Sequence, residues 1–340
     1  MEMADGMRIT TVEMHTGGEP LRVVTSGLPE IRGKTLLDKR RYIRENLDHI
    51  RKFLMFEPRG HYDMYGVYLV EPDEPGADLA CIFIHNEGYS TMCGHAVLAL
   101  GRYAVDKGIV RNPTAPSTRV VIQCPCGPVE AHVEYTEGGQ TGAVAFNSVP
   151  AFLYMKDVEV DVPGTGVVTV DVSYGGAFYA LVPASRLGLD LSTASIQDIK
   201  QKAGQVTDIL RPSLQLSHPD SPDLAFLYGT IVTDGNDIFS DKETANVCVF
   251  AEREVDRSPC GSGVTARIAQ QYFRSLIKLD QSREFRGPAG SKFKARAIKE
   301  VRYGPHDAVV VEVSGKGHYS GECTFTLEDD DHIGKGFLLK

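Results

Sequence analysis

The stretch Leu79-Ala80-Cys81-Ile82-Phe83-Ile84, with Cys93-Gly94-His95 after it, occurs a second time in altered form. The second version is Asn246-Val247-Cys248-Val249-Phe250-Ala251, followed by Cys260-Gly261-Ser262. In each version a Phe stands two residues after the first Cys, and a Cys-Gly pair begins twelve residues after it. The two Cys-Gly pairs are 167 residues apart in a chain of 340. This register indicates an internal duplication and two halves of similar fold.

Each half has the same expected local structure. Residues 79–85 and 246–251 are short, apolar and rich in β-branched side chains, which is typical of buried strands. Residues 96–104 and 264–272 carry an apolar face at helical spacing. We therefore expect an α+β fold in which each half is a curled sheet around one central helix. Further strands are expected at 119–123, 129–135, 167–172, 308–313 and 323–327.

Length and composition narrow the possible classes of protein. A chain of 340 residues is long enough for two domains, and the pattern places a seam near 148–150. The net charge of −9 argues against nucleic acid as a partner, because phosphate binding needs clustered Lys and Arg. No apolar run has the length of a membrane span, and the first residues do not resemble a secretory signal. We expect a cytoplasmic protein that acts on a small molecule.

The seven cysteines do not form the pattern of a disulfide framework, since their number is odd and the chain is large. Cys124-Pro125-Cys126 has closer spacing than the ligand pairs of structural zinc sites, so we expect no metal. We also expect no cofactor, because neither a Walker loop nor a dinucleotide-binding glycine motif is present. A thiol-based metal or redox sensor is the alternative outside the enzymes.

A cysteine at the first turn of a helix lies where the helix dipole and unpaired N–H groups favour an anion. Such a thiol can act as a base near neutral pH. Many cysteines are simply small buried apolar residues, and Cys81 and Cys248 fit that interpretation. Cys93 and Cys260 differ, because a pseudo-twofold axis between duplicated halves would bring them face to face. One thiolate could then remove a proton from a carbon while the other thiol protonates the opposite face.

The motifs around these cysteines resemble those of a known family. Thr91-Met92-Cys93-Gly94-His95 and Asp256-Arg257-Ser258-Pro259-Cys260-Gly261-Ser262-Gly263 are similar to the two signatures of the proline racemase family. Residues 14–20, 55–61 and 174–179 extend the similarity over nearly the whole chain. The family includes proline racemases, 4-hydroxyproline 2-epimerases and trans-3-hydroxy-L-proline dehydratases.

The resemblance implies two diaminopimelate-epimerase-like domains with the active site in the cleft between them, and a homodimer. It places the first domain at 1–150, carrying Cys93, with about 315–340 returning to it. The second domain, at 151–314, carries Cys260.

The resemblance also implies roles for individual residues. Cys93 and Cys260 would be the acid/base pair. The other implied roles concern substrate binding. The substrate carboxylate would be held by the N–H groups of Gly94, His95, Gly261 and Ser262. The ring nitrogen would contact Asp256 and His95, the ring would lie between Tyr65 and Phe250, and His218 is a further candidate near the pocket.

Two reactions remain open. Racemases and epimerases of the family carry Cys at both catalytic positions, whereas animal-type 3-hydroxyproline dehydratases carry Thr at the second. Cys260 therefore favours inversion of the α-carbon of proline or hydroxyproline. The rest of the chain, including 86–90 and 223–229, is most similar to the dehydratases, which form pyrroline-2-carboxylate. The reaction type depends more on the residue that must protonate the α-carbon than on overall similarity. Because that residue is Cys260, we expect a cofactor-independent racemase or epimerase, with dehydration as the alternative.

Overall fold

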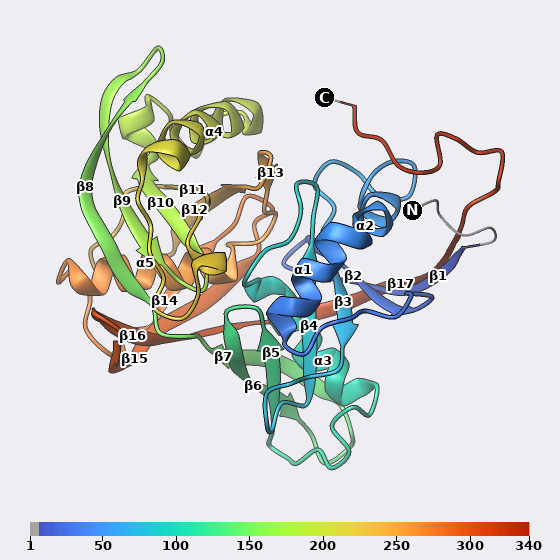
Figure 1. Ribbon diagram of the computed structural model, residues 1–340. Helices are drawn as coiled ribbons and strands as arrows, with labels where there is room; N and C mark the ends of the chain where they lie inside the picture. The colour runs from blue at the N-terminus through green and yellow to red at the C-terminus, as the bar shows by residue number, and fades with distance from the viewer. Residues whose placement is uncertain (1–6, 340) are drawn as a thin grey trace. The chain divides into compact units, whose positions relative to one another are not determined.

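Helix α3 (Gly94–Asp106) and helix α5 (Gly261–Phe273) each begin at the glycine of a Cys-Gly pair, as the repeated pattern predicts. The structure is a computed structural model that describes residues 7–339 (Figure 1). The strands that precede these helices, β4 (Leu79–Ile84) and β12 (Thr244–Phe250), are buried along their whole length. Each Cys-Gly pair is thus reached from a core strand and continues into a helix.

The contacts within the chain divide it into two units. The first contains the described residues up to Thr91, Ala96–Val144, and those from Lys316 onward. The second contains Met92–His95 and Ala145–Gly315. By its contacts Cys93 therefore groups with the second unit, and the expected domain bounds, with Cys93 in the first domain, stay a prediction. The backbones of two glycines approach closely here, since a Cβ atom added to Gly94 would lie 2.4 Å from the Cα atom of Gly261.

The first unit is a mixed sheet with helices against it. Its strands are ordered β17–β1–β2–β3–β4–β5–β6, in which β2–β3 and β4–β5 are parallel and the other pairs are antiparallel. Helices α1 and α2 contribute Ile43, Ile50 and Phe53 to a core shared with the strands. The first eight residues of α3 are buried, and Ala99 packs against Gly317 of β17. The bounds are β1 Arg8–Thr16, β2 Glu19–Ser26, α1 Leu36–Asn46, α2 Asp48–Met55, β3 Gly66–Val70, β5 Ser117–Cys124, β6 Gly127–Tyr135, β7 Thr141–Asn147 and β17 Gly317–Thr326.

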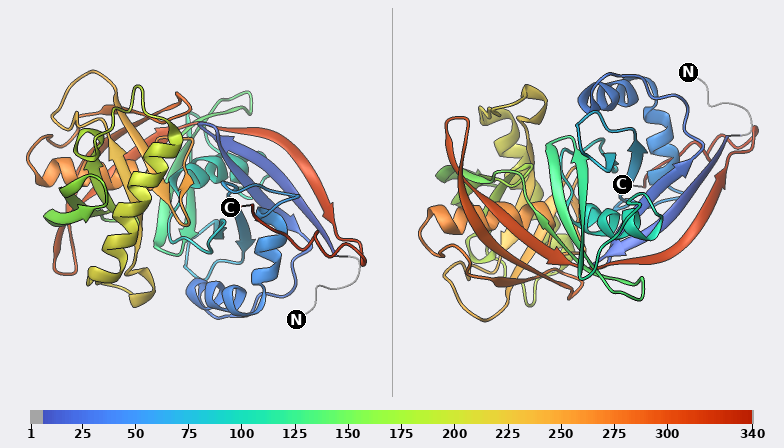
Figure 2. Two further views of the ribbon diagram at one scale, coloured as in Figure 1. Left: turned by 90° about the horizontal axis from the view of Figure 1, so that it is seen from above. Right: turned by 90° about the horizontal axis from the view of Figure 1, so that it is seen from below.

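The second unit has its own mixed sheet, ordered β8–β9–β10–β11–β12–β14–β15–β16, with β10–β11 and β12–β14 parallel. Helix α5 is buried from Gly261 to Gln271 and contacts β8, β9, β10, β15 and β16. Figure 2 shows the long strands β15 and β16 curving beside it. The bounds are β8 Phe152–Val162, β9 Gly166–Tyr174, β10 Phe178–Pro183, η1 Ala184–Leu187, α4 Ile196–Ser213, η2 Pro222–Leu224, β11 Leu227–Thr233, β13 Glu254–Val255, β14 Arg283–Arg286, β15 Lys292–Tyr303 and β16 His306–Gly315.

The same sequence of pairings occurs in both units. From β1 to β6 and from β9 to β15, successive sheet neighbours are antiparallel, parallel, antiparallel, parallel and antiparallel. In both units the first parallel connection contains surface helices and the second contains the buried helix α3 or α5. This is the α+β arrangement of a curled sheet around a central helix that the repeated motifs predict. Among residues 7–339, no helix has the length and apolar character to cross a membrane.

Candidate active site

The first nominated cysteine has an imidazole as its immediate polar neighbour. The Sγ atom of Cys93 lies 3.0 Å from Nδ1 of His95, and 5% of Cys93 and 3% of His95 are exposed. Cys93 immediately precedes α3, and His95 is the second residue of that helix. A thiol that can transfer its proton to an imidazole at a helix N-terminus has two features that favour the thiolate.

The loop before Cys93 is held by two buried arginines of the first unit. Arg51 donates to the carbonyls of His85 and Asn86, at 2.8 Å and 2.6 Å, and is paired with Asp48. Arg40 donates to the carbonyl of Tyr89 at 2.6 Å. These bonds satisfy buried carbonyls that no sheet ladder reaches, and so they fix the path of the chain toward Cys93.

The second cysteine occupies a constrained backbone position. Cys260 is the N-cap of α5 with φ of 67°, a left-handed conformation that non-glycine residues seldom adopt. Its N–H donates to the Oγ atom of Ser258 at 3.1 Å, and Asn246 donates to the carbonyl of Pro259. Backbone strain of this kind persists where surrounding bonds hold it and is common at functional sites.

Helix α5 is tied to the strand before it by Arg267, which has no exposed surface. Arg267 donates to Oδ1 of Asn246 at 2.6 Å and forms ion pairs with Asp234 and Asp237. The same Asn246 side chain reaches Pro259. A continuous network of hydrogen bonds therefore joins the helix body to the residue preceding Cys260.

Asp256 is a buried carboxyl close to the same cysteine. Its Oδ1 atom accepts the N–H of Ser258 at 2.8 Å. Burial raises its pKa from 3.8 to about 6, while hydrogen bonds from Ser258 and from the Cys260 thiol act in the opposite direction. Such a carboxylate is poorly solvated and would gain from an ammonium partner.

Tyr179 and Ser262 provide hydroxyls beside the second cysteine. The Tyr179 hydroxyl lies 2.8 Å from Oγ of Ser262, and Sγ of Cys260 lies 3.9 Å from each of these oxygens. The sequence nominated Ser262 for its N–H and did not assign a role to Tyr179. The sequence contained a weak signal for Tyr179, because this residue ends the family motif at 174–179. Nothing in the sequence indicates that it contacts Cys260, which is 81 positions away.

Two glycines allow the helix starts to approach. A Cβ atom on Gly261 would lie 2.5 Å from the Cα atom of Gly94, the reciprocal of the contact described above. The first N–H groups of a helix have no partners within it and favour an anion. The N–H groups of Gly94, His95, Gly261 and Ser262 therefore remain the predicted carboxylate ligands.

The other nominated residues lie in different surroundings. Tyr65 belongs to the first unit, where its hydroxyl is hydrogen-bonded to that of Ser90. Phe250 packs against Tyr228, with ring centroids 5.3 Å apart. His218 contacts the ring of Tyr174 at 5.0 Å, and burial lowers its pKa. The roles of all three in substrate binding stay predictions.

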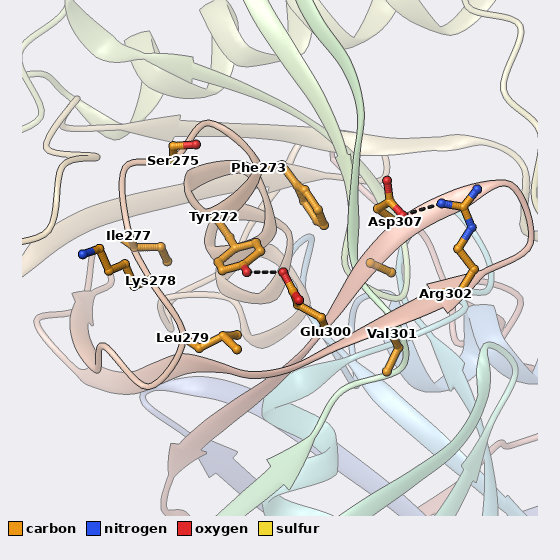
Figure 3. A pocket seen from close by; sticks show the side chains of 11 residues that line it. Tyr272, Phe273, Ser275, Ile277, Lys278, Leu279, Glu300, Val301, Arg302 and Asp307 are labelled. Carbon is orange, nitrogen blue, oxygen red and sulfur yellow. Dashed lines mark hydrogen bonds and ion pairs between the residues drawn. The ribbon is translucent and has the colours of Figure 1, made fainter.

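A hollow of about 770 Å³ in the second unit lies away from these residues. It is lined by the end of α5, the segment after it, and β15 and β16 (Figure 3). Tyr272 is hydrogen-bonded to Glu300, and Arg302 is paired with Asp307. Neither nominated cysteine lines this hollow. Among residues 7–339, no three His, Cys, Asp or Glu side chains are grouped to hold a metal ion.

Comparison with known proteins establishes the family. The family model described as Proline racemase matches residues 11–338. The chain belongs to the proline racemase family.

The predicted fold is confirmed by comparison with two solved structures. A hydroxyproline epimerase from Agrobacterium vitis, with bound trans-4-OH-L-proline, is 25% identical with a TM-score of 0.92, covering 99% of this chain and 96% of that one. A probable proline racemase from Agrobacterium radiobacter K84, with bound carbonate, is 26% identical with a TM-score of 0.90, covering 97% and 96%.

Among curated members of the proline racemase family, similarity is higher to proteins named as dehydratases. Trans-L-3-hydroxyproline dehydratase of Xenopus tropicalis is 56% identical over 337 residues, covering 99% of this chain and 97% of its own. Trans-3-hydroxy-L-proline dehydratase of Homo sapiens is 56% identical over 335 residues, covering 98% and 95%. These relatives favour the alternative reaction over the inversion that Cys260 led us to expect.

Proposed function

We propose that this protein is a cofactor-independent hydro-lyase that removes water from trans-3-hydroxy-L-proline, with Cys93 as the base. The observation that carries the proposal is the 3.0 Å approach of the Cys93 sulfur to His95 at the start of α3. An imidazole at this distance can accept the thiol proton and leave a thiolate nearby. The 56% identity to named dehydratases over nearly the whole chain supports elimination as the outcome.

The stereochemistry of the substrate explains why one thiolate suffices. In trans-3-hydroxy-L-proline the hydroxyl and the carboxylate are on opposite ring faces, so the hydroxyl shares a face with the Cα–H bond. Cys93 takes the Cα proton, and the electron pair of that bond forms the Cα=C3 double bond as the C3–O bond breaks. The departing hydroxide takes up a proton on the same face from the Cys93 thiol, which returns to the thiolate, and leaves as water. The product, pyrroline-2-carboxylate, then tautomerises to its ketimine form.

Backbone and carboxylate groups supply the binding interactions in this proposal. The N–H groups of Gly94, His95, Gly261 and Ser262 hold the substrate carboxylate, where they stabilise the charge that develops as Cα loses its proton. Asp256 binds the ring ammonium, which offsets the cost of its own burial. We place Tyr65, Phe250 and His218 around the ring.

Inversion at Cα is the second candidate, and it is favoured by Cys260. Elimination needs no acid on the ring face opposite Cys93, yet this chain carries a thiol, 5% exposed like Cys93, beside two hydroxyls. A thiol there can deliver a proton to the opposite face after Cys93 removes one. Under this candidate the substrate is proline or a hydroxyproline.

Incubation of the purified protein in deuterated water with trans-3-hydroxy-L-proline, trans-4-hydroxy-L-proline and L-proline distinguishes the candidates. For the hydro-lyase, borohydride reduction after reaction converts the ketimine from trans-3-hydroxy-L-proline into proline. For the second candidate, deuterium appears at Cα with formation of the D-configured product. Inversion without dehydration would overturn the proposal, and so would the absence of reaction with trans-3-hydroxy-L-proline.

A further inference from the structure

The least expected contact of Cys260 is with Tyr179, a tyrosine without any exposed surface on strand β10. Its hydroxyl is the polar end of an otherwise apolar side chain, and such a group needs a hydrogen-bond partner when it is buried. The Ser262 hydroxyl, 2.8 Å away, provides that partner. The sulfur of Cys260 lies 3.9 Å from both oxygens and is therefore equidistant from them.

We infer that Tyr179 is a positioning residue that, with Ser262, orients the Cys260 sulfur and bonds to it in both of its protonation states. A hydroxyl can rotate and serve as donor or acceptor. When Cys260 is a thiol, its single proton can be donated to the Tyr179 oxygen, 3.9 Å away, or to the Asp256 carboxylate. When it is a thiolate, the Tyr179 and Ser262 hydroxyls can turn and donate to the sulfur.

The surroundings keep the phenol in its neutral form. Burial raises the pKa of Tyr179 well above 10, and the nearby Cys260, Cys248 and Tyr228 raise it further. A neutral phenol retains the proton that it needs in order to donate. Two titratable groups in contact with this sulfur are Tyr179 on β10 and Asp256 before α5, and Cys248 and Tyr228 lie near Tyr179.

Backbone geometry makes such orientation necessary. Cys260 has φ of 67°, and a Cβ atom on Gly263 would lie 2.6 Å from Cδ1 of Ile231 and 2.9 Å from the Cys260 sulfur. The sulfur is thus enclosed between the first turn of α5 and strand β11. Polar contact comes from the Tyr179–Ser262 pair, with Asp256 as the charged neighbour.

The two thiols consequently have different partners, imidazole for Cys93 and a hydroxyl pair for Cys260. This inference rests on the proposed site but concerns the second thiol, which elimination does not require. Loss of Tyr179 should therefore impair inversion and spare dehydration. The effect of losing Tyr179 on the reactivity of the Cys260 thiol can be measured without substrate. A failure of the proposed function and a failure of this inference are therefore distinguishable.

The test is alkylation by iodoacetamide across a pH series, with each cysteine quantified by peptide mass spectrometry. Cys93 is the internal control, since both sulfurs belong to residues that are 5% exposed. A hydrogen bond to a thiolate favours the charged form, so Tyr179→Phe should slow Cys260 labelling at pH 8 by about three- to tenfold. The labelling profile of Cys260 should move to higher pH, while that of Cys93 stays unchanged.

Tyr228→Phe is the matched control variant, because it removes a phenol hydroxyl from the ring that meets Tyr179 edge-on at 5.8 Å. It should leave both profiles unchanged. Ser262→Ala removes the other hydroxyl without altering an aromatic ring, and it should shift Cys260 in the same direction even if Tyr179→Phe does not fold. An unchanged Cys260 profile in a folded Tyr179→Phe or Ser262→Ala protein would overturn the inference, and so would an equal shift of Cys93.

Discussion

The Nδ1 atom of His95, in the first turn of α3, lies 3.0 Å from the Sγ atom of Cys93, the residue that immediately precedes the helix. The pair belongs with the second unit by its contacts, although α3 continues into the first. At this distance a proton can pass between the two atoms without movement of either residue, so in the proposed mechanism the thiolate forms before substrate binds.

His95→Asn should therefore lower kcat for dehydration by about 100-fold, since the thiolate loses its proton acceptor. The dependence of kcat on pH should also change shape on the acid side. Loss of packing alone would lower kcat without changing that shape. Steady-state kinetics between pH 5 and pH 9 measure both effects. His132→Asn, on a partly buried histidine of β6 that pairs with Glu130, is the control and should retain full activity.

Cys93→Ser should abolish both dehydration and inversion, with a loss of at least about 1,000-fold, because a hydroxyl is a far weaker base than a thiolate at neutral pH. Rates with trans-3-hydroxy-L-proline and trans-4-hydroxy-L-proline measure the loss. Cys323→Ser, a partly buried cysteine on β17, provides the matched control. Activity of Cys93→Ser near that of Cys323→Ser would exclude Cys93 as the base.

Substitution of Cys260 is expected to distinguish dehydration from inversion. Cys260→Ser should retain dehydration within about fivefold and reduce inversion by at least about 100-fold, since a serine hydroxyl is a poor proton donor to carbon. Cys260→Thr should behave likewise in both assays. If Cys260→Ser lost dehydration and inversion equally, the single-base scheme would be wrong.

The threonine variant should also be less stable than the serine variant. A β-branched side chain is strained at φ of 67°, by about 1 kcal/mol or more. Urea denaturation of the two variants measures the difference in the free energy of unfolding. Equal midpoints and slopes would show that α5 shifts its first turn to relieve the strain.

Asp256 gives a pH dependence whose direction follows from its raised pKa. Burial raises this pKa from 3.8 to about 6, so the folded state holds a proton that the unfolded state releases between these values. The carboxyl therefore destabilises the fold progressively as pH rises from about 4 to 6. Asp256→Asn should remove this loss of stability, which urea denaturation at pH 4 and pH 7 will measure.

Substrate binding should strengthen as pH rises, whereas stability falls, because the substrate ammonium needs an ionised carboxylate. For the wild-type protein, kcat/KM should rise with pH through a midpoint near 6. In Asp256→Asn that step should disappear, and KM should increase more than kcat decreases. A step that persists at the same pH in the variant would assign it to another group.

The sequence predicted the elements around the cysteines because their signals are local. The expected strand at 79–85 is β4 (Leu79–Ile84), and the expected helix at 264–272 lies within α5 (Gly261–Phe273). Alternation and helical spacing are properties of neighbouring residues, so they can be recognised without knowledge of the tertiary structure. The repeated Cys-Gly pair also showed which residues of the two halves correspond to each other.

The contacts of Tyr179 could not be predicted in this way. Its approach to Cys260 depends on the parallel pairing of β10 with β11 and on the position of α5 against β10. The Tyr65 hydroxyl is likewise bonded to Ser90, a partner set by the path of the loop before Cys93. The choice between elimination and inversion was equally inaccessible, because it depends on which faces of the substrate the two thiols address.

The approach of Gly94 to Gly261 gives the last prediction. Alanine is normally preferred to glycine in a helix by about 0.5–1 kcal/mol, so on propensity alone Gly94→Ala and Gly261→Ala would be stabilising. Here the new Cβ atom would lie 2.4 Å or 2.5 Å from the opposite Cα atom, far inside the carbon–carbon contact distance of about 3.5–4.0 Å. The helix starts must then move apart by about 1 Å, and a displacement of that size at reacting groups costs about 100-fold in rate. Each variant should lose dehydration to at least this extent, and Gly321→Ala, where no atom lies within 4 Å of the added Cβ, should keep it. Full activity in Gly94→Ala or Gly261→Ala would show that the spacing of the two helix starts does not limit the reaction.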